Sequence, residues 1–139
     1  MRKLAVGILL LFFTSVAQAQ TVEGIWATAK RDASVLIYDC GNSLCGKIAW
    51  LKQPNDPKTG KPWIGANGKP ILGQPISGEM TKKSPRQWVG KVYDIRNDGA
   101  AYDGSITLQS DSALKIEGCF MYIFCESEIL KRIPQVAAN

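Results

Sequence analysis

Residues 86–109 read RQWVGKVYDIRNDGAAYDGSITLQ, and apolar and polar side chains alternate on both sides of one turn signal. Before the turn, Trp88 and Val92 alternate with Lys91 and Tyr93, and the residues after it alternate in the same way. A period of two residues is typical of a β-strand with one buried face. Asn97-Asp98-Gly99, between the two segments, contains the Asp-Gly pair that tight hairpin turns favour. The stretch therefore predicts an antiparallel hairpin.

The same alternation recurs along the chain and predicts further short strands. The predicted strands cover residues 22–28, 34–40, 45–52, 86–95, 101–109, 113–120 and 122–133. Residues 53–78 are rich in Pro and Gly and predict a long loop, with one short edge strand at Ile71-Leu72. Seven or eight antiparallel strands joined in sequence indicate an all-β meander, folded as a barrel or a sandwich.

The N-terminus has the pattern of an export signal. Arg2 and Lys3 are followed by an apolar run over residues 4–13 and by the small-x-small site Ala17-Gln18-Ala19. The run is about half the length of a spanning helix, which disfavours an uncleaved membrane anchor. We expect residues 1–19 to be a signal peptide. Residues 20–139 would then form one domain, with its core in 22–133, in the periplasm or secreted, without a transmembrane anchor.

Positive charge is concentrated in the middle of the chain, whose net charge is +5. Residues 47–91 contain nine Lys or Arg and two Asp or Glu. The overall charge is too small to indicate a nucleic-acid partner. The basic segment predicts a positive patch facing an anionic lipid, sugar or ligand carboxylate, and the alternative is a loop that only keeps the protein in solution.

An even number of cysteines in an exported chain indicates disulfides. Cys40 with Cys45, and Cys119 with Cys125, each flank a predicted turn, so we favour these local pairs over cross-pairing. The spacings fit neither a Cys₄ zinc site nor the C-x-x-C pattern of a redox site. We therefore expect structural disulfides and no metal.

The sequence contains no histidine, which removes the commonest general base and metal ligand. Asp94, Asp98 and Asp103 lie close together in sequence, and paired carboxylates are the minimum for a glycosidase. Turn formation and solvation are the simpler roles for them. No glycine-rich phosphate loop is present. We expect a protein that is not an enzyme and uses no cofactor.

Aromatic side chains on the predicted strands offer the better functional signal, because those that face inward would line a pocket or fill the core. The candidate ligand-binding residues are Trp26, Tyr38, Trp50, Trp88, Tyr93 and Tyr102.

Gly24 and Trp26 on the first strand, with Arg132 near the end of the last, resemble the lipocalin closure, in which a basic residue lies across the tryptophan face. The run Cys40-Gly41-Asn42-Ser43-Leu44-Cys45-Gly46 resembles a bacterial exported family called domain of unknown function 2147. Residues 88–94 and 114–119 extend that resemblance. It implies export and a lipocalin-like barrel of about eight strands. The family has no established biochemical role, so the resemblance implies no catalytic residues.

Three functional hypotheses follow. The first is an exported barrel that binds a small apolar or amphipathic ligand, with the basic segment 47–91 meeting an anionic head group. The second is an envelope protein-interaction or stress module that uses the barrel as a scaffold and the loop 53–78 as its contact surface. Trp63 in that loop would either cap a cavity or pin the loop to the barrel. The third is a histidine-free hydrolase using Asp94 or Asp103.

Overall fold

The computed structural model describes residues 21–65, 67–95, 99–121 and 123–134. The predicted signal peptide, residues 1–19, and two residues of the predicted hairpin turn, 97 and 98, lie outside this part of the chain. Within it there is no helix, and hence none with the length and apolar character needed to cross a bilayer. All the regular structure that can be described is β-strand.

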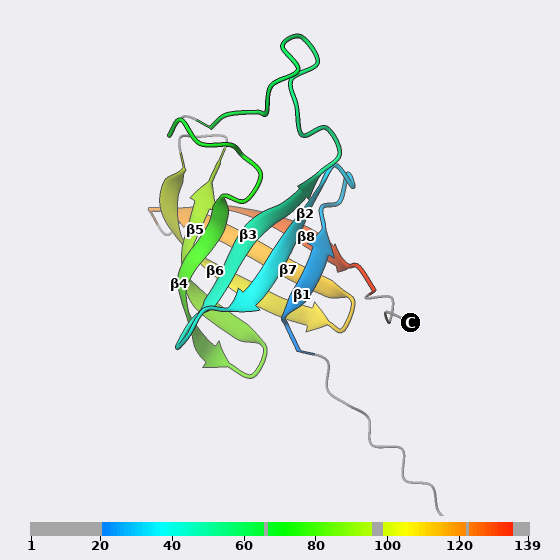
Figure 1. Ribbon diagram of the computed structural model, residues 1–139. Helices are drawn as coiled ribbons and strands as arrows, with labels where there is room; N and C mark the ends of the chain where they lie inside the picture. The colour runs from blue at the N-terminus through cyan, green and yellow to red at the C-terminus, as the bar shows by residue number, and fades with distance from the viewer. Residues whose placement is uncertain (1–20, 66, 96–98, 122, 135–139) are drawn as a thin grey trace, which may run out of the picture.

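Eight antiparallel strands follow one another around a closed barrel (Figure 1). Each strand pairs with its neighbour in sequence, and β8 returns to β1 through the pairs Trp26 with Arg132 and Ala27 with Lys131. This confirms the predicted meander and selects the barrel over the sandwich. The strands are β1 Gly24–Ala27, β2 Ala33–Asp39, β3 Leu44–Leu51, β4 Pro75–Ser84, β5 Gln87–Asp94, β6 Ala100–Ser110, β7 Ala113–Phe120 and β8 Phe124–Arg132.

The alternating strand directions divide the connections between two ends of the barrel. The start of β1 and the β2–β3, β4–β5 and β6–β7 connections share one end, which we call the N-terminal end. The β1–β2, β3–β4, β5–β6 and β7–β8 connections share the other, which we call the loop end. The long β3–β4 connection projects from the loop end, at the top of Figure 1.

Strand β4 corrects the sequence prediction, which gave a loop for its first residues and no strand for the rest. Pro75 occupies the first position of the strand, where a missing N–H is tolerated. Glu79 has a φ of 53° and lies where the register with β5 shifts, so the alternation of the strand is interrupted by a bulge. The edge strand predicted at Ile71-Leu72 is wrong, because these residues form only a bend and a turn.

The core is apolar and continuous. Ten hydrophobic residues are buried, and Trp88, Val92 and three isoleucines pack against them. The buried residues are Val22, Trp26, Val35, Ile37, Leu44, Met80, Ile106, Leu108, Leu114 and Leu130. They come from the N-terminal segment and from every strand except β5, so burying them closes the sheet on itself.

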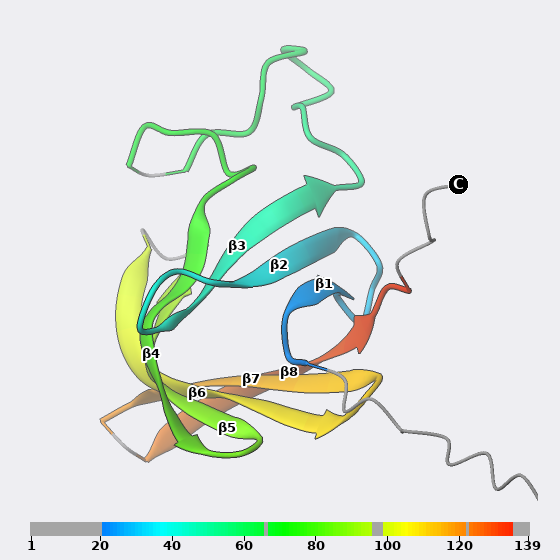
Figure 2. The same cartoon turned by 60° about the horizontal axis from the view of Figure 1, so that its bottom comes forward.

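Three glycines lie in adjacent strands where the sheet bends. The register pairs Gly90 of β5 with Gly104 of β6, and Gly104 with Gly118 of β7. A Cβ on Gly104 would overlap the backbone oxygen of Glu117, and one on Gly90 would lie 2.5 Å from that of Glu79. Without side chains at these points, β6 can bend as sharply as Figure 2 shows.

Both predicted disulfides are present. Cys40–Cys45 spans the β2–β3 connection with a Cα separation of 5.8 Å, and Cys119–Cys125 joins directly opposed residues of β7 and β8 at 4.0 Å. No described cysteine is free. Each bridge therefore fixes one hairpin, one at each end of the barrel.

Candidate functional site

The predicted closure of the barrel is formed by Trp26 and Arg132. The Trp26 indole is fully buried and donates a hydrogen bond from Nε1 to the Val22 carbonyl at 3.0 Å. The Arg132 guanidinium donates to three backbone carbonyls, of Thr21, Glu23 and Asp111. These bonds hold the N-terminal segment, residues 21–23, across the end of the barrel.

Gly24 makes room for this closure. Its φ is 131°, a conformation that L side chains rarely adopt. A Cβ at this position would lie 3.2 Å from Nη1 of Arg132. The glycine is therefore required both by the turn into β1 and by the guanidinium beside it.

A pocket of about 250 Å³ opens beside the N-terminal segment, between it, the β2–β3 connection and strands β4 and β5. Its volume is slightly below the roughly 300–1,000 Å³ of sites for drug-sized ligands. Apolar side chains form part of its wall, and polar or charged ones form the rest. The lining residues are Val22, Glu23, Asp39, Gly41, Asn42, Ser43, Leu44, Met80, Lys82 and Trp88.

The motif Cys40-Gly41-Asn42-Ser43-Leu44-Cys45-Gly46 builds one side of this pocket. The disulfide holds the two ends of the turn together, and Gly41 N donates to the Asp39 carboxylate at 2.9 Å. Leu44 is buried in the core, while the residues before it stay at the surface. The Leu44 side chain thus anchors the turn in the core, and the polar groups of the turn line the opening of the pocket.

Trp88 is the aromatic wall of the pocket. Lys82 pairs with it across β4 and β5, and Lys82 Nζ lies 5.7 Å from the centroid of the indole. Lys82 is the only lysine or arginine in the lining, where Glu23 and Asp39 also contribute charge. The rim is therefore of mixed charge, and of the nine bases in the segment that was expected to meet an anionic head group, only Lys82 lines this pocket.

The six aromatic residues predicted to bind a ligand do not form a single lining. Trp26 fills the core, and Trp88 reaches the pocket. Tyr102 makes an edge-to-face contact with Phe120 towards the loop end, with ring centroids 6.4 Å apart. Trp50, at the end of β3, is 49% exposed.

Tyr38 and Tyr93 lie on the outside of the barrel, which corrects their assignment to an interior site. Tyr38 follows the buried Ile37 and carries Lys47 Nζ 5.4 Å from its ring centroid. Tyr93 follows Val92, which packs on the core, and its hydroxyl lies beside Gly78. Successive residues of a strand point to opposite faces, so both tyrosines point away from the core.

The carboxylates of the hydrolase hypothesis do not share a face. Asp103 pairs with Lys91 across β5 and β6, and its carboxylate accepts a hydrogen bond from Lys91 Nζ at 2.7 Å. Asp94 lies an odd number of residues from Lys91 on the same strand, so its side chain points to the opposite face. Asp98 is outside the described residues. The paired arrangement that glycoside hydrolysis requires is therefore not formed by Asp94 and Asp103.

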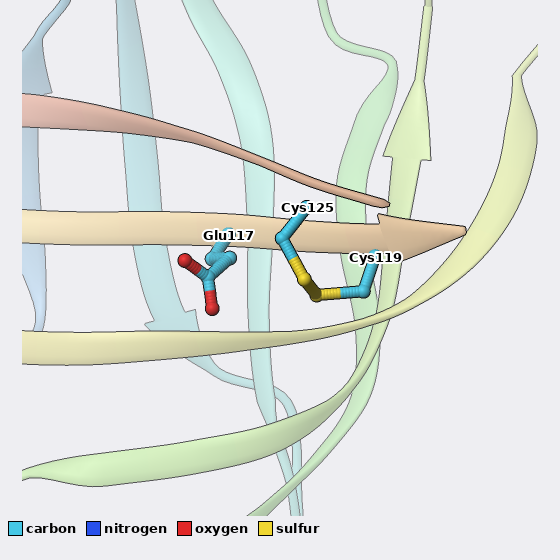
Figure 3. A group of neighbouring side chains, drawn as sticks. All are labelled: Glu117, Cys119 and Cys125. Atoms are coloured by element: carbon cyan, nitrogen blue, oxygen red, sulfur yellow. A yellow bond between two sulfur atoms is a disulfide. The ribbon is translucent and has the colours of Figure 1, made fainter. Parts of the chain in front are cut away.

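A second hollow, of about 710 Å³, crosses the outer face of β4 to β7. Glu117 and Cys119 line it, and Figure 3 shows the Glu117 carboxylate beside the Cys119–Cys125 disulfide. Both sulfur atoms of this cluster are bonded to each other, so neither is available as a thiolate ligand. The cluster offers one carboxylate, which by itself does not make a metal site.

Sequence reasoning missed most of the pocket because its lining comes from segments far apart in the chain. Met80 and Lys82 belong to the strand that was not predicted, and Glu23 lies in the segment before β1. Two signals were available in the sequence: Trp88, which was named as a candidate ligand-binding residue, and the cysteine-bounded turn, which matched the family but was assigned only a structural role.

A search of curated proteins finds no match to this chain. Among solved structures, protein HP1028 of the human pathogen Helicobacter pylori, described as belonging to the lipocalin family, matches with a TM-score of 0.58 and 14% identity. The match covers 84% of this chain and 85% of that one, and shows that the two share a fold. The family model "Uncharacterized protein conserved in bacteria (DUF2147)" matches residues 24–132, from the first residue of β1 to the last of β8, and the chain therefore belongs to this bacterial family.

Proposed function

We propose that this barrel binds a small amphipathic molecule in the pocket at its N-terminal end and does not transform it. The observation that carries the proposal is the lining of that pocket, which combines the apolar residues Leu44, Met80 and Trp88 with the charged residues Glu23, Asp39 and Lys82. An apolar wall with a few polar groups is typical of small-molecule sites. A volume of about 250 Å³ suits a fragment-sized molecule or the end of a longer chain.

The mixed charge of the rim supports a ligand whose polar end is neutral or zwitterionic. Two carboxylates and one ammonium are close enough to the opening to contact such a group. The protein's lack of histidine and the separation of Asp94 from Asp103 favour binding without catalysis. The lipocalin-like fold is compatible with ligand binding and does not by itself identify the ligand.

Binding would take place in the periplasm, or outside the cell if the protein is secreted. The two disulfides support this location, because such bonds persist in oxidising compartments. The N-terminal sequence supports it as well, since it has the pattern of an export signal. Cell fractionation with mass measurement of the purified protein tests the location: we expect an envelope or extracellular protein that begins at Gln20.

Native mass spectrometry of protein recovered from its own envelope tests the binding. We expect an additional small mass that is removed by mild activation. The variant Asn42→Trp places a large side chain at the lip of the pocket and should abolish the adduct. Asn55→Trp makes the same exchange on the exposed β3–β4 connection and should leave it unchanged. Protein that is always empty, and that also fails to bind short-chain alkyl alcohols by NMR titration, would contradict the proposal.

A further inference from the structure

The surface at the loop end of the barrel is formed largely by the β3–β4 connection, which combines positive charge with exposed apolar side chains. We call residues 52–74 the basic loop, because they contain four exposed lysines and one acidic residue, Asp56. The lysines are Lys52, Lys58, Lys61 and Lys69. The loop projects beyond the strands in both views (Figures 1 and 2), so its charges stand clear of the rest of the barrel.

The basic loop is folded rather than extended. Its first part closes through Asp56 N to Lys61 O at 2.8 Å and through a bridge between Asn55 and Pro62. Its second part closes through Ile71 N to Trp63 O at 2.9 Å. The loop therefore consists of two small hairpin-like turns, and its side chains are presented from a defined backbone.

Asp56 has a structural role within the loop. Its carboxylate accepts a hydrogen bond from Lys58 N at 2.8 Å, and its backbone oxygen accepts one from Gly60 N at 2.7 Å. No other acidic residue occurs in residues 52–74, so the loop has a net charge of +3.

Apolar side chains are exposed beside these lysines. Trp63, Ile64 and Leu72 are 40%, 54% and 47% exposed. A second group lies on the β7–β8 connection, which belongs to the same end of the barrel but to the opposite side from the basic loop (Figure 2), and consists of Phe120, Met121, Ile123 and Phe124. Ile123 and Phe124 are the most exposed large apolar residues of the described chain. Clustered apolar side chains at a surface usually mark an interaction site.

We propose that the loop end of this barrel docks onto an anionic lipid bilayer. Lysines attract anionic head groups, and the Trp, Ile and Leu side chains exposed on the same loop enter the boundary between head groups and acyl chains. Indole rings favour that boundary because one part is apolar and the N–H is polar. The charge of the basic loop favours a phospholipid surface over a second copy of the chain, since two such loops would repel each other. Docking does not depend on ligand binding in the pocket, which lies at the opposite end.

Co-sedimentation with vesicles tests the docking. The protein is used in its processed form, with the N-terminus checked by mass spectrometry so that the predicted signal peptide does not contribute. We expect binding to phosphatidylcholine vesicles that contain phosphatidylglycerol, and much weaker binding to pure phosphatidylcholine. Because the Debye length falls from about 10 Å at 0.1 M salt to about 3 Å at 1 M, binding should weaken strongly over that range.

Charge variants identify the surface involved. Lys58→Gln with Lys61→Gln removes two charges from the basic loop and should weaken binding about 30-fold, given about 1 kcal/mol for each basic residue near an anionic surface. Lys83→Gln with Arg86→Gln removes two charges near the β4–β5 connection, at the N-terminal end, and should change binding less than threefold. Equal losses in the two double variants would overturn the proposal.

Apolar variants separate docking from simple charge attraction. Ile64→Ser with Leu72→Ser removes two exposed apolar side chains of the basic loop and should also weaken binding to the anionic vesicles. Circular dichroism verifies that each variant remains folded. Sedimentation velocity examines the alternative occupant: a dimer that is lost in this double variant, with no vesicle binding by the parent protein, would assign the surface to a protein contact and overturn the proposal.

Discussion

The Arg132 guanidinium lies over the Trp26 indole, with Cζ 4.2 Å from the ring centroid. The pair joins the first strand to the last, where the register of the barrel contains only two residue pairs. The same guanidinium binds the Thr21 and Glu23 carbonyls, so one side chain holds the barrel seam and the N-terminal segment together. That segment also contributes Val22 and Glu23 to the pocket.

Arg132→Lys should lower the free energy of unfolding by about 2–3 kcal/mol, because an ammonium cannot stack on the indole and reach three carbonyls at once. Urea denaturation monitored by fluorescence measures the change. Arg86→Lys serves as a matched control, since Arg86 is largely exposed and its carboxylate partner Asp111 is 3.8 Å away. The control should change stability by less than about 1 kcal/mol. Equal effects in the two variants would show that the seam does not depend on the guanidinium.

The glycine row at the bend of the sheet predicts a contrast between two adjacent positions. Gly104→Ala should destabilise by about 1–3 kcal/mol, because its Cβ would overlap a backbone oxygen that cannot move independently of β7. In Gly118→Ala the new Cβ would lie 3.7 Å from its nearest neighbours, which is an ordinary contact. This variant should lower the free energy of unfolding by less than about 1 kcal/mol. Thermal unfolding of both variants provides the comparison. A larger loss at Gly118 would contradict this account of the bend.

The two disulfides should contribute similarly to stability and differently to function. Each closes a short loop, and chain entropy predicts a loss of about 2 kcal/mol when either pair is replaced by serines. Cys40→Ser with Cys45→Ser should also weaken ligand binding, because this turn lines the pocket. Cys119→Ser with Cys125→Ser affects the opposite end and should leave pocket binding unchanged. NMR titration with short-chain alkyl alcohols compares ligand binding by the two double-serine variants. Identical binding by both variants would argue against the pocket as the site.

Ser77 is buried, and among the described residues no group pairs with its hydroxyl oxygen. Burying an unpaired hydroxyl is costly, so Ser77→Ala should stabilise the barrel by about 1 kcal/mol. Thr28→Ala provides the opposite case, because the Thr28 hydroxyl donates to the Asp32 carboxylate at 2.7 Å and accepts from the Ala33 backbone N–H. The Thr28→Ala variant should have a free energy of unfolding that is about 1 kcal/mol lower. Chemical denaturation of both variants checks the signs, and a destabilised Ser77→Ala would mean that the hydroxyl has a partner after all.

Local sequence patterns were sufficient to predict most of the strands. The alternation of apolar and polar residues over residues 86–109 predicted β5 and β6, and the register confirms that Trp88 and Ile106 lie opposite each other. The cysteine pairs were predictable because each closes a short hairpin. The sequence also contained the residues of the closure, Gly24, Trp26 and Arg132, and their resemblance to the lipocalin closure predicted the contact of Arg132 with Trp26.

The strand β4 and the positions of several aromatic residues depended on tertiary structure. Pro75, Gly78 and a run of lysines resemble a loop locally, and Met80 becomes a core residue only because β3 and β5 pair on either side. Tyr93 alternates with Val92, but sequence alone could not say whether an aromatic residue on that face would find a cavity or solvent.

The amino-acid sequence by itself determined a β-meander with two local disulfides, because hairpins and alternation are set by residues close together in the chain. Only the tertiary structure decided where the pocket lies, since Val22, Leu44, Met80 and Trp88 meet only once the sheet closes. It also decided that the basic loop and the apolar β7–β8 connection share one end of the barrel. The physical reason is that closure brings distant segments together, and the free energy that selects that arrangement comes from burial of the whole core and not from any one segment.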